Sequence, residues 1–304
     1  MLSAATDNFF RVTPSAPGER RCAPGEAGKC RTAPLASHTC SNGSRRTPSV
    51  AARPARSSAR PRHVERCEPG TAGRNSVRSA AVDVLDTYSG HTDPGGAAIR
   101  RDLGGLTLTK VSVGPMDNNA YLLVCTSTGE ALLVDAANEP ERLAELVGTA
   151  EGARLRTTVT THRHYDHWQA LGAVAERFST RQVAHPLDAP ELPVPADETV
   201  EHGGTVTVGE AQLEVVHLRG HTPGSIALLY RGADRPHLLT GDSLFPGGPG
   251  RTTSPEDFTS LIEDLEQRVF GPLPDETWVY PGHGDDTTLG AERPSLPEWR
   301  TRGW

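Results

Sequence analysis

Three of the 12 histidines stand within one short run of the sequence, T-H-R-H-Y-D-H-W, which holds His162, His164, Asp166 and His167. Because side chains two residues apart in an extended or turn segment point to the same side, His162 and His164 can face one metal ion. Asp166 and His167 follow where a helical pattern begins, and they can face a second ion. Imidazole and carboxylate, without thiolate, are ligands that suit Zn²⁺. The run therefore predicts a metal centre at a strand-to-helix turn.

Three further fragments each carry one residue of a metal-ligand type on a turn marked by glycine. They are R-G-H-T-P-G-S with His221, L-T-G-D-S-L-F with Asp242, and Y-P-G-H-G with His283. Each fragment follows a predicted strand, so all three side chains can project from one edge of the sheets. The glycine before each of them allows a positive φ and the close backbone approach that a crowded metal loop needs.

Taken together, these four runs resemble the metallo-β-lactamase superfamily of metallohydrolases, and within it the hydroxyacylglutathione hydrolase (glyoxalase II-like) branch, over about residues 105–290. The resemblance implies a four-layer αβ/βα sandwich with the site at the edge between two sheets. It also implies two divalent metal ions, most of all Zn²⁺, with Fe or Mn accepted by the same ligands. The implied ligands are His162, His164 and His221 for the first ion, Asp166, His167 and His283 for the second, and Asp242 as a bridge, with Asp135 supporting them without binding metal.

The implied activity is hydrolysis of thioesters of the hydroxyacyl-thiol type. A hydroxide that bridges the two ions would attack the carbonyl, with Asp166 and Asp242 as the catalytic carboxylates. A lactonase or β-lactamase-type hydrolase would use the same ligands with a different leaving group, and this alternative stays open. A persulfide dioxygenase relative would hold a single iron with two histidines and one aspartate. The complete set of seven ligand residues favours a site with two metal ions over a site with a single iron.

Two residues are candidates for contact with the substrate. Arg251, in G-G-P-G-R-T-T-S, stands where the resemblance places a cationic residue near the carboxylate of the thiol, and Tyr165 lies inside the histidine run. The chain also departs from the branch, with Ser225 in place of a second histidine and Thr252 in place of an aromatic residue. Only about 20 residues follow His283. These departures predict that the native thiol differs from glutathione.

Three other polar residues are interpreted without a role in the site. Asn118 and Asn119 stand before a predicted strand, where turn chemistry alone explains them. His185, in V-A-H-P-L-D-A-P, is interpreted as a structural histidine.

Two groups of strands with helices between them must position the metal residues. β-Rich runs and helical spacings alternate along the chain, and they predict two sheets packed face to face with helices outside, in the α/β (α+β) class. The expected strands are 105–114, 119–126 and 130–137 as an antiparallel meander, then 156–162, 204–209, 211–220, 225–232, 236–245 and, as the last, 276–283, with helices over 140–150, 167–178 and 254–270.

Charge divides the 304 residues into two regions. Residues 1–80 hold 14 Lys and Arg against 5 Asp and Glu, whereas residues 81–304 hold 17 against 33. We expect a disordered basic tail over 1–81 and a hydrolase domain over 82–304, because the tail lacks periodic apolar patterning. The tail has three explanations: an organelle transit peptide, an arm attracted to nucleic acid or membranes, or a start codon placed too far upstream.

Composition excludes several classes of partner. The acidic domain is a poor electrostatic match for nucleic acid, and the sequence predicts neither a membrane span nor a secretory signal. Cys125 is the one cysteine of the domain, so no disulfide framework is expected there and a cytoplasmic setting is favoured. The expected partner is a small-molecule thioester or related acyl substrate, with no nucleic acid and no membrane. The residues indicate no particular oligomeric state.

Overall fold

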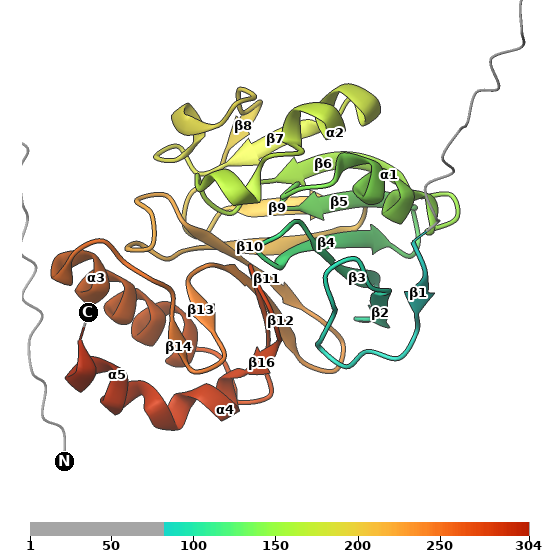
Figure 1. The fold of residues 1–304 in the computed structure, drawn as a ribbon. Coiled ribbons are helices and arrows are strands. Elements are labelled where there is room, and N and C mark those ends of the chain that lie inside the picture. The colour runs from blue at the N-terminus through green and yellow to red at the C-terminus, as the bar shows by residue number, and fades with distance from the viewer. Residues whose placement is uncertain (1–81, 304) are drawn as a thin grey trace, which may run out of the picture. The chain divides into compact units, whose positions relative to one another are not determined.

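The computed structural model describes residues 82–303, and the disordered basic tail expected over 1–81 lies outside them. Two β-sheets stack face to face within this region, and helices cover their outer faces (Figure 1). The mixed sheets and outer helices confirm the predicted four-layer sandwich. Among the described residues, no helix has the length and apolar character needed to cross a membrane.

The first sheet has eight strands that are neighbours in the order of the sequence. Its strands from β2 to β5 pair antiparallel, as the predicted meander requires, and those from β5 to β8 pair parallel. The strands are β1 (Val84–Leu85), β2 (Ala98–Asp102), β3 (Leu106–Val113), β4 (Asn118–Cys125), β5 (Glu130–Val134), β6 (Arg154–Val159), β7 (Arg181–Ala184) and β8 (Glu198–Thr199).

The second sheet has six strands, in the order β16-β15-β12-β11-β10-β9. All its neighbours pair antiparallel except β12 and β15, which run parallel. The strands are β9 (Thr205–Val208), β10 (Ala211–His217), β11 (Ile226–Arg231), β12 (Pro236–Gly241), β15 (Trp278–Pro281) and β16 (Thr287–Thr288), and a small separate hairpin joins β13 (Leu244–Phe245) to β14 (Gly248–Pro249).

Helices form the two outer layers. The helices on the first sheet are α1 (Pro140–Gly148) and α2 (Leu171–Phe178). Those packed with the second sheet are α3 (Pro255–Leu265), α4 (Leu289–Glu292) and α5 (Leu296–Arg302). Short helical turns occupy Tyr165–His167, Ala189–Glu191 and Arg293–Ser295, and a π-helical turn over Glu266–Phe270 continues α3.

Side-chain alternation along single strands fills three hydrophobic cores. In β5, Leu132 points between the sheets while Leu133 points towards α1 and α2. In β11, Leu228 likewise faces the space between the sheets and Leu229 faces α3. Because successive side chains of a strand point to opposite faces, such strands must be apolar on both sides. This explains why their sequences read as continuous hydrophobic runs.

Several predicted boundaries differ from the structure, and the start of α2 was wrong by four residues. The helix expected from residue 167 begins at Leu171, and the metal-ligand run ends in the tight turn Tyr165–His167. The main chain before the helix is tied to the segment after β5, with Gln169 N donating to the carbonyl of Ala137 and Ala170 N to that of Ala136. These bonds fix the segment in a non-helical path, so the helix cannot start earlier.

The strand ending near residue 283 is not the last element. β16 pairs with β15, and α4 and α5 follow it. Thr288 caps α4, because its Oγ1 accepts a hydrogen bond from Ala291 N, and Trp299 of α5 is 1% exposed in the outer core. The sequence prediction also missed β1, β2 and β8. The first and last of these have two residues each and therefore no readable periodicity.

Candidate metal centre

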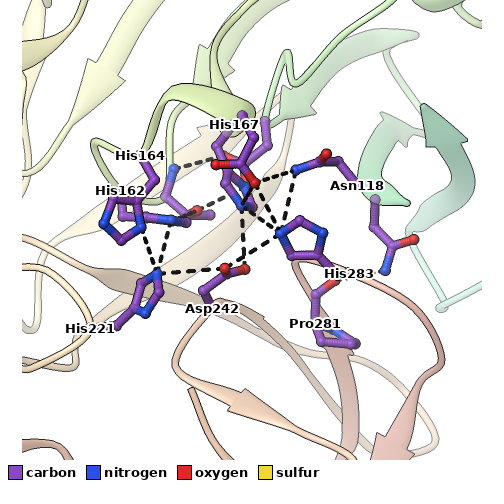
Figure 2. A network of polar contacts seen from close by, with 12 residues as sticks. Asn118, His162, His164, His167, His221, Asp242, Pro281 and His283 are labelled. Carbon is purple, nitrogen blue, oxygen red and sulfur yellow. Dashed lines mark hydrogen bonds and ion pairs between the residues drawn. The ribbon is translucent and has the colours of Figure 1, made fainter. Parts of the chain in front are cut away.

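All seven predicted ligand residues meet at one edge of the two sheets (Figure 2). They come from four loops, which follow β6, β10, β12 and β15. Their nitrogen and oxygen atoms form three overlapping groups, each with its atoms within 4.8 Å of one another: His162, His164 and His221; His162, His167 and Asp242; Asp166, His167 and His283. The chain thus brings together side chains that are up to 121 positions apart in the sequence.

The first group consists of three imidazoles that converge on one point. His221 Nε2 lies 2.8 Å from His164 Nδ1 and 3.3 Å from His162 Nε2. The remaining nitrogen of His221 donates to the carbonyl of Arg251 at 2.7 Å, and that of His162 lies 3.0 Å from Thr161 Oγ1. These outer contacts orient the rings of His162 and His221 and leave their Nε2 atoms facing inward.

The second group combines one carboxylate with two imidazoles. His283 Nε2 lies 3.2 Å from both Asp166 Oδ2 and His167 Nε2. The other nitrogen of His283 donates to the carbonyl of Met116 at 2.8 Å. His283 therefore also presents its Nε2 atom to the centre.

Asp242 lies between the two groups. Its Oδ2 atom is 3.5 Å from the Nε2 atoms of His221 and His283, and its Oδ1 atom is 3.4 Å from His167 Nε2. Oδ1 is buried and has no hydrogen-bond partner among the described residues. A buried acceptor without a donor is costly, and a cation on each side of the carboxylate would satisfy it. The donor set therefore fits two divalent ions with a shared carboxylate.

Asp135 supports the centre without belonging to either ligand group. Its Oδ1 atom accepts from Thr161 N at 2.8 Å, and its Oδ2 atom accepts from Thr161 Oγ1 at 2.8 Å and lies 2.9 Å from His167 Nδ1. Asp135 is 2% exposed and has a φ of 58°. A carboxylate on the outer nitrogen of a ligating histidine fixes the orientation of the ring.

Burial and charge divide the histidines into two electrostatic classes. Burial lowers the pKa of His162, His164 and His221, so these rings are neutral near pH 7. Burial acts in the same direction on His167 and His283, but the carboxylates beside them outweigh it and raise both pKa values. Metal ligation needs unprotonated ring nitrogens, so metal uptake must displace protons from this second pair.

The three predicted glycines are required by the crowding at the site. A Cβ atom on Gly282 would lie 2.1 Å from Asp242 Oδ1 and 2.8 Å from His167 Cε1. Gly220 and Gly241 have φ values of 132° and 48°. Glycine alone combines these backbone conformations and approaches without strain.

Asn118 is a residue of the site that the sequence interpretation missed. It is buried, and its Nδ2 atom donates to Asp166 Oδ2 at 2.9 Å and lies 3.4 Å from His283 Nε2. Asn119 donates from its side chain to the carbonyls of Pro281 and Gly284, each at 2.9 Å. Turn chemistry alone was therefore the wrong explanation for both. Their contacts are with residues more than 45 positions away, and no local pattern reveals them.

The two candidate substrate residues lie in different surroundings. The side chain of Arg251 is exposed and lines a cavity of about 260 Å³ together with Phe258 and Arg302. Tyr165 is 63% exposed, and its ring packs edge-on against Trp168 with 5.1 Å between the centroids. The contact of either residue with a substrate stays a prediction.

Comparison with known proteins agrees with this geometry. The family model described as the metallo-beta-lactamase superfamily matches residues 113–283. The chain belongs to this superfamily of metallo-hydrolases and is similar to its hydroxyacylglutathione hydrolases, which confirms the resemblance inferred from its motifs.

Three proteins illustrate the similarity. A hydroxyacylglutathione hydrolase of Thermosynechococcus vestitus is 35% identical over 198 residues, which cover 60% of this chain and 72% of that protein. The crystal structure of BLEG-1 B3 metallo-beta-lactamase shares 29% identity with a TM-score of 0.56, over 63% of this chain and 98% of that one. The structure of TTHA1623 in a di-iron-bound form shares 31% identity with a TM-score of 0.53, over 62% of this chain and 99% of that one.

Proposed function

We propose that the protein hydrolyses thioesters of the hydroxyacyl-thiol type with the help of two divalent metal ions, and that Zn²⁺ is the preferred metal. The observation that carries this proposal is the position of Asp242, whose carboxylate lies between two groups of ligand atoms and whose buried Oδ1 atom, 3.4 Å from His167 Nε2, makes no hydrogen bond within residues 82–303. The similarity to hydroxyacylglutathione hydrolases supports the choice of substrate class. Fe and Mn are accepted by the same ligand types.

The residues that would hold the ions are those named for the two groups. His162, His164 and His221 would bind the first ion, Asp166, His167 and His283 the second, and Asp242 both. When bound, two such ions supply a Lewis acid for the substrate carbonyl and lower the pKa of a water towards ~7.

Asp166 has the properties needed to orient a water molecule. Burial acts to raise its pKa, but the contacts with His283, His167 and Asn118 outweigh burial and hold the pKa below its usual value. The Asp166 side chain is partly exposed, whereas His167 and Asp242 behind it are buried. A carboxylate that stays ionised at an open edge can accept a hydrogen bond from an incoming water.

The cavity beside Arg251 favours a thiol that carries a negative charge. Arg251 and Arg302 both line it, and Phe258 supplies an apolar wall. The carbonyl of Arg251 accepts from His221 Nδ1, so the cavity adjoins the first group through the main chain. A guanidinium group pairs well with a carboxylate. Arg251 would therefore bind the thiol half of the substrate.

A second candidate is a lactonase or β-lactamase-type activity. The similarity to BLEG-1 B3 metallo-beta-lactamase favours it, because the two chains share the fold over almost the whole of that protein. A dioxygenase with a single iron has less support, since Asp166, His167 and His283 would then have no ion to hold.

The test compares three substrates with the Zn²⁺-loaded full chain: S-D-lactoylglutathione, a lactoyl thioester of an uncharged thiol, and a simple lactone. We expect both thioesters to be cleaved, with the charged one preferred. Arg251→Ala should raise KM for the charged thioester alone, because the substitution keeps the main-chain carbonyl that holds His221. Lactone cleavage without thioester cleavage would reject the proposal in favour of the second candidate.

The remaining expectations about partners stay predictions. We expect no binding to nucleic acid or membranes and a cytoplasmic location. The buried Cys125 is a free thiol, which is compatible with a reducing compartment.

A further inference from the structure

Asp188 is a buried carboxylate close to the metal centre that belongs to neither ligand group. It lies in the turn after β7, where Asp188 N and Ala189 N both donate to the carbonyl of His185. Its side chain is 1% exposed. A carboxylate at such a depth is costly unless donors surround it, so its partners indicate what it does.

One set of partners belongs to the loop that carries the first two histidines. Arg163 N donates to Asp188 Oδ2 at 3.0 Å, and Arg163 Nε lies 3.9 Å from Asp188 Oδ1. Arg163 stands between His162 and His164 in the sequence. The bond to its amide therefore holds the main chain from which both imidazoles project.

The other set of partners belongs to the loop that carries His221. Thr222 Oγ1 donates to Asp188 Oδ2 at 2.5 Å, and Gly224 N donates to Asp188 Oδ1 at 2.9 Å. The approach is so close that a Cβ atom on Gly224 would lie 2.7 Å from Asp188 Cγ. Thr222 directly follows His221, so this end of the carboxylate fixes the third imidazole.

We infer that Asp188 is a positioning residue for the first metal ion. One carboxylate accepts hydrogen bonds from both loops and thereby sets the separation between His221 and the pair His162 and His164. It touches none of the three imidazoles and acts through the main chain and Thr222. This inference rests on the proposed function in one respect, that the three histidines hold an ion.

The alternative is that Asp188 only stabilises the fold, and Glu292 provides a matched control. Glu292 is 6% exposed, and its carboxylate also accepts from one backbone amide and one threonine hydroxyl, those of Gly247 at 2.9 Å and Thr287 at 2.7 Å. Neither partner stands next to a metal ligand in the sequence. Glu292→Gln therefore shows how much the unfolding temperature and the zinc affinity change when a buried carboxylate that supports no ligand loop is altered.

The experiment measures zinc affinity in the full chain by competition with a chelator, together with thermal unfolding. Asp188→Asn should weaken the binding of one of the two ions by about 10–100-fold, the range expected for a residue that orients metal ligands. Glu292→Gln should leave both affinities within about twofold, the scatter expected of a residue that orients no ligand. Thr222→Val, a milder change that keeps Asp188, should weaken the same ion by a smaller factor and protects the test against misfolding of Asp188→Asn.

Two backgrounds assign the effect to the first ion. In His283→Ala, which disables the second group, Asp188→Asn should still weaken the remaining ion. In His221→Ala, which disables the first group, it should have no further effect. The inference is overturned if Asp188→Asn and Glu292→Gln lower the unfolding temperature by the same amount and Asp188→Asn weakens zinc binding no more than Glu292→Gln does. Failure of the proposed function is distinguishable, because the unaltered chain would then bind zinc without cleaving any thioester.

Discussion

At the scale of single residues, the centre depends on which nitrogen of each histidine faces inward. His167, His221 and His283 are held by their Nδ1 atoms, which contact Asp135, the carbonyl of Arg251 and the carbonyl of Met116. His164 differs, because its Nδ1 atom faces His221. An oxygen on the outer nitrogen fixes the tautomer and leaves the inner lone pair for a metal ion.

Asn118→Ala tests a residue that the sequence did not reveal. The side-chain amide of Asn118 donates to Asp166 Oδ2 from outside the ligand groups, so its loss should make it easier for that carboxylate to rotate away from the second group. We expect kcat/KM to fall by about 10–100-fold, with the free energy of unfolding changed much less. Steady-state kinetics with the Zn²⁺-loaded protein measures this. Unchanged kinetics in a variant with full zinc content would show that Asp166 needs no such support.

The ligand residues and Asp135 could be predicted from the sequence, whereas the other supports of the ligands could not. The spacing in T-H-R-H-Y-D-H-W limits which side chains can meet one ion, because the run is local. Every residue has a main-chain carbonyl, so the identities of Met116 and Arg251 do not indicate that their carbonyls orient metal ligands. Asp188 is likewise hidden, since its partners Arg163 and Gly224 use backbone amides.

At the scale of elements, strand register delivers two of the ligands to the same place. β12 and β15 run parallel, with Gly241 opposite Pro281, and Gly282 N donates to the carbonyl of Gly241 at 2.9 Å. Asp242 and His283 therefore leave adjacent strands side by side. The sequence predicted both strands and their glycine-marked ends. Their parallel pairing depends on the intervening helix α3, whose crossover the strand patterns do not specify.

The start of α3 also contacts the site, and Ser254→Ala tests its cap. Ser254 Oγ accepts from Asp257 N at 3.1 Å, and the first turn packs so closely on Gly220 that an added Cβ would lie 2.3 Å from the Asp257 carbonyl oxygen. We expect the substitution to lower the free energy of unfolding by about 1 kcal/mol, measured by urea denaturation. Ser260→Ala, at a partly buried position of the same helix, is the control and should lower the free energy of unfolding by less. If the two substitutions lower the free energy of unfolding equally, the cap makes no specific contribution to stability.

At the scale of the whole molecule, both sheets supply ligand loops, so their packing is part of the site. The core between the sheets is apolar, and His237 lies buried at its margin with Nδ1 2.8 Å from the Tyr280 hydroxyl. Burial, with the nearby charge of Arg101, lowers the pKa of His237 to about 4. The ring therefore stays neutral in the fold at pH values where it would be charged in the unfolded chain.

A pH dependence of stability follows from this shift. With an unfolded pKa near ~6.5, the unfolded chain binds the extra proton as the pH falls from about 6.5 towards 4, and the folded chain does not. Stability should therefore decrease with falling pH across this window. His237→Gln should reduce that decrease, measured by denaturation of the metal-free protein at several pH values. A variant that keeps the full slope would show that His237 is protonated without penalty.

The metal content of the purified full chain, determined by elemental mass spectrometry alongside thioester hydrolysis, decides whether the protein is a two-metal thioester hydrolase. The two ligand groups around Asp242 predict about two divalent ions per chain, mostly zinc, with turnover of the thioester. His283→Ala should lower the content to about one, the ion that the first group still holds. A chain that binds about one iron and cleaves no thioester is not a two-metal hydrolase, and this result would favour oxygen-dependent sulfur chemistry on the same fold.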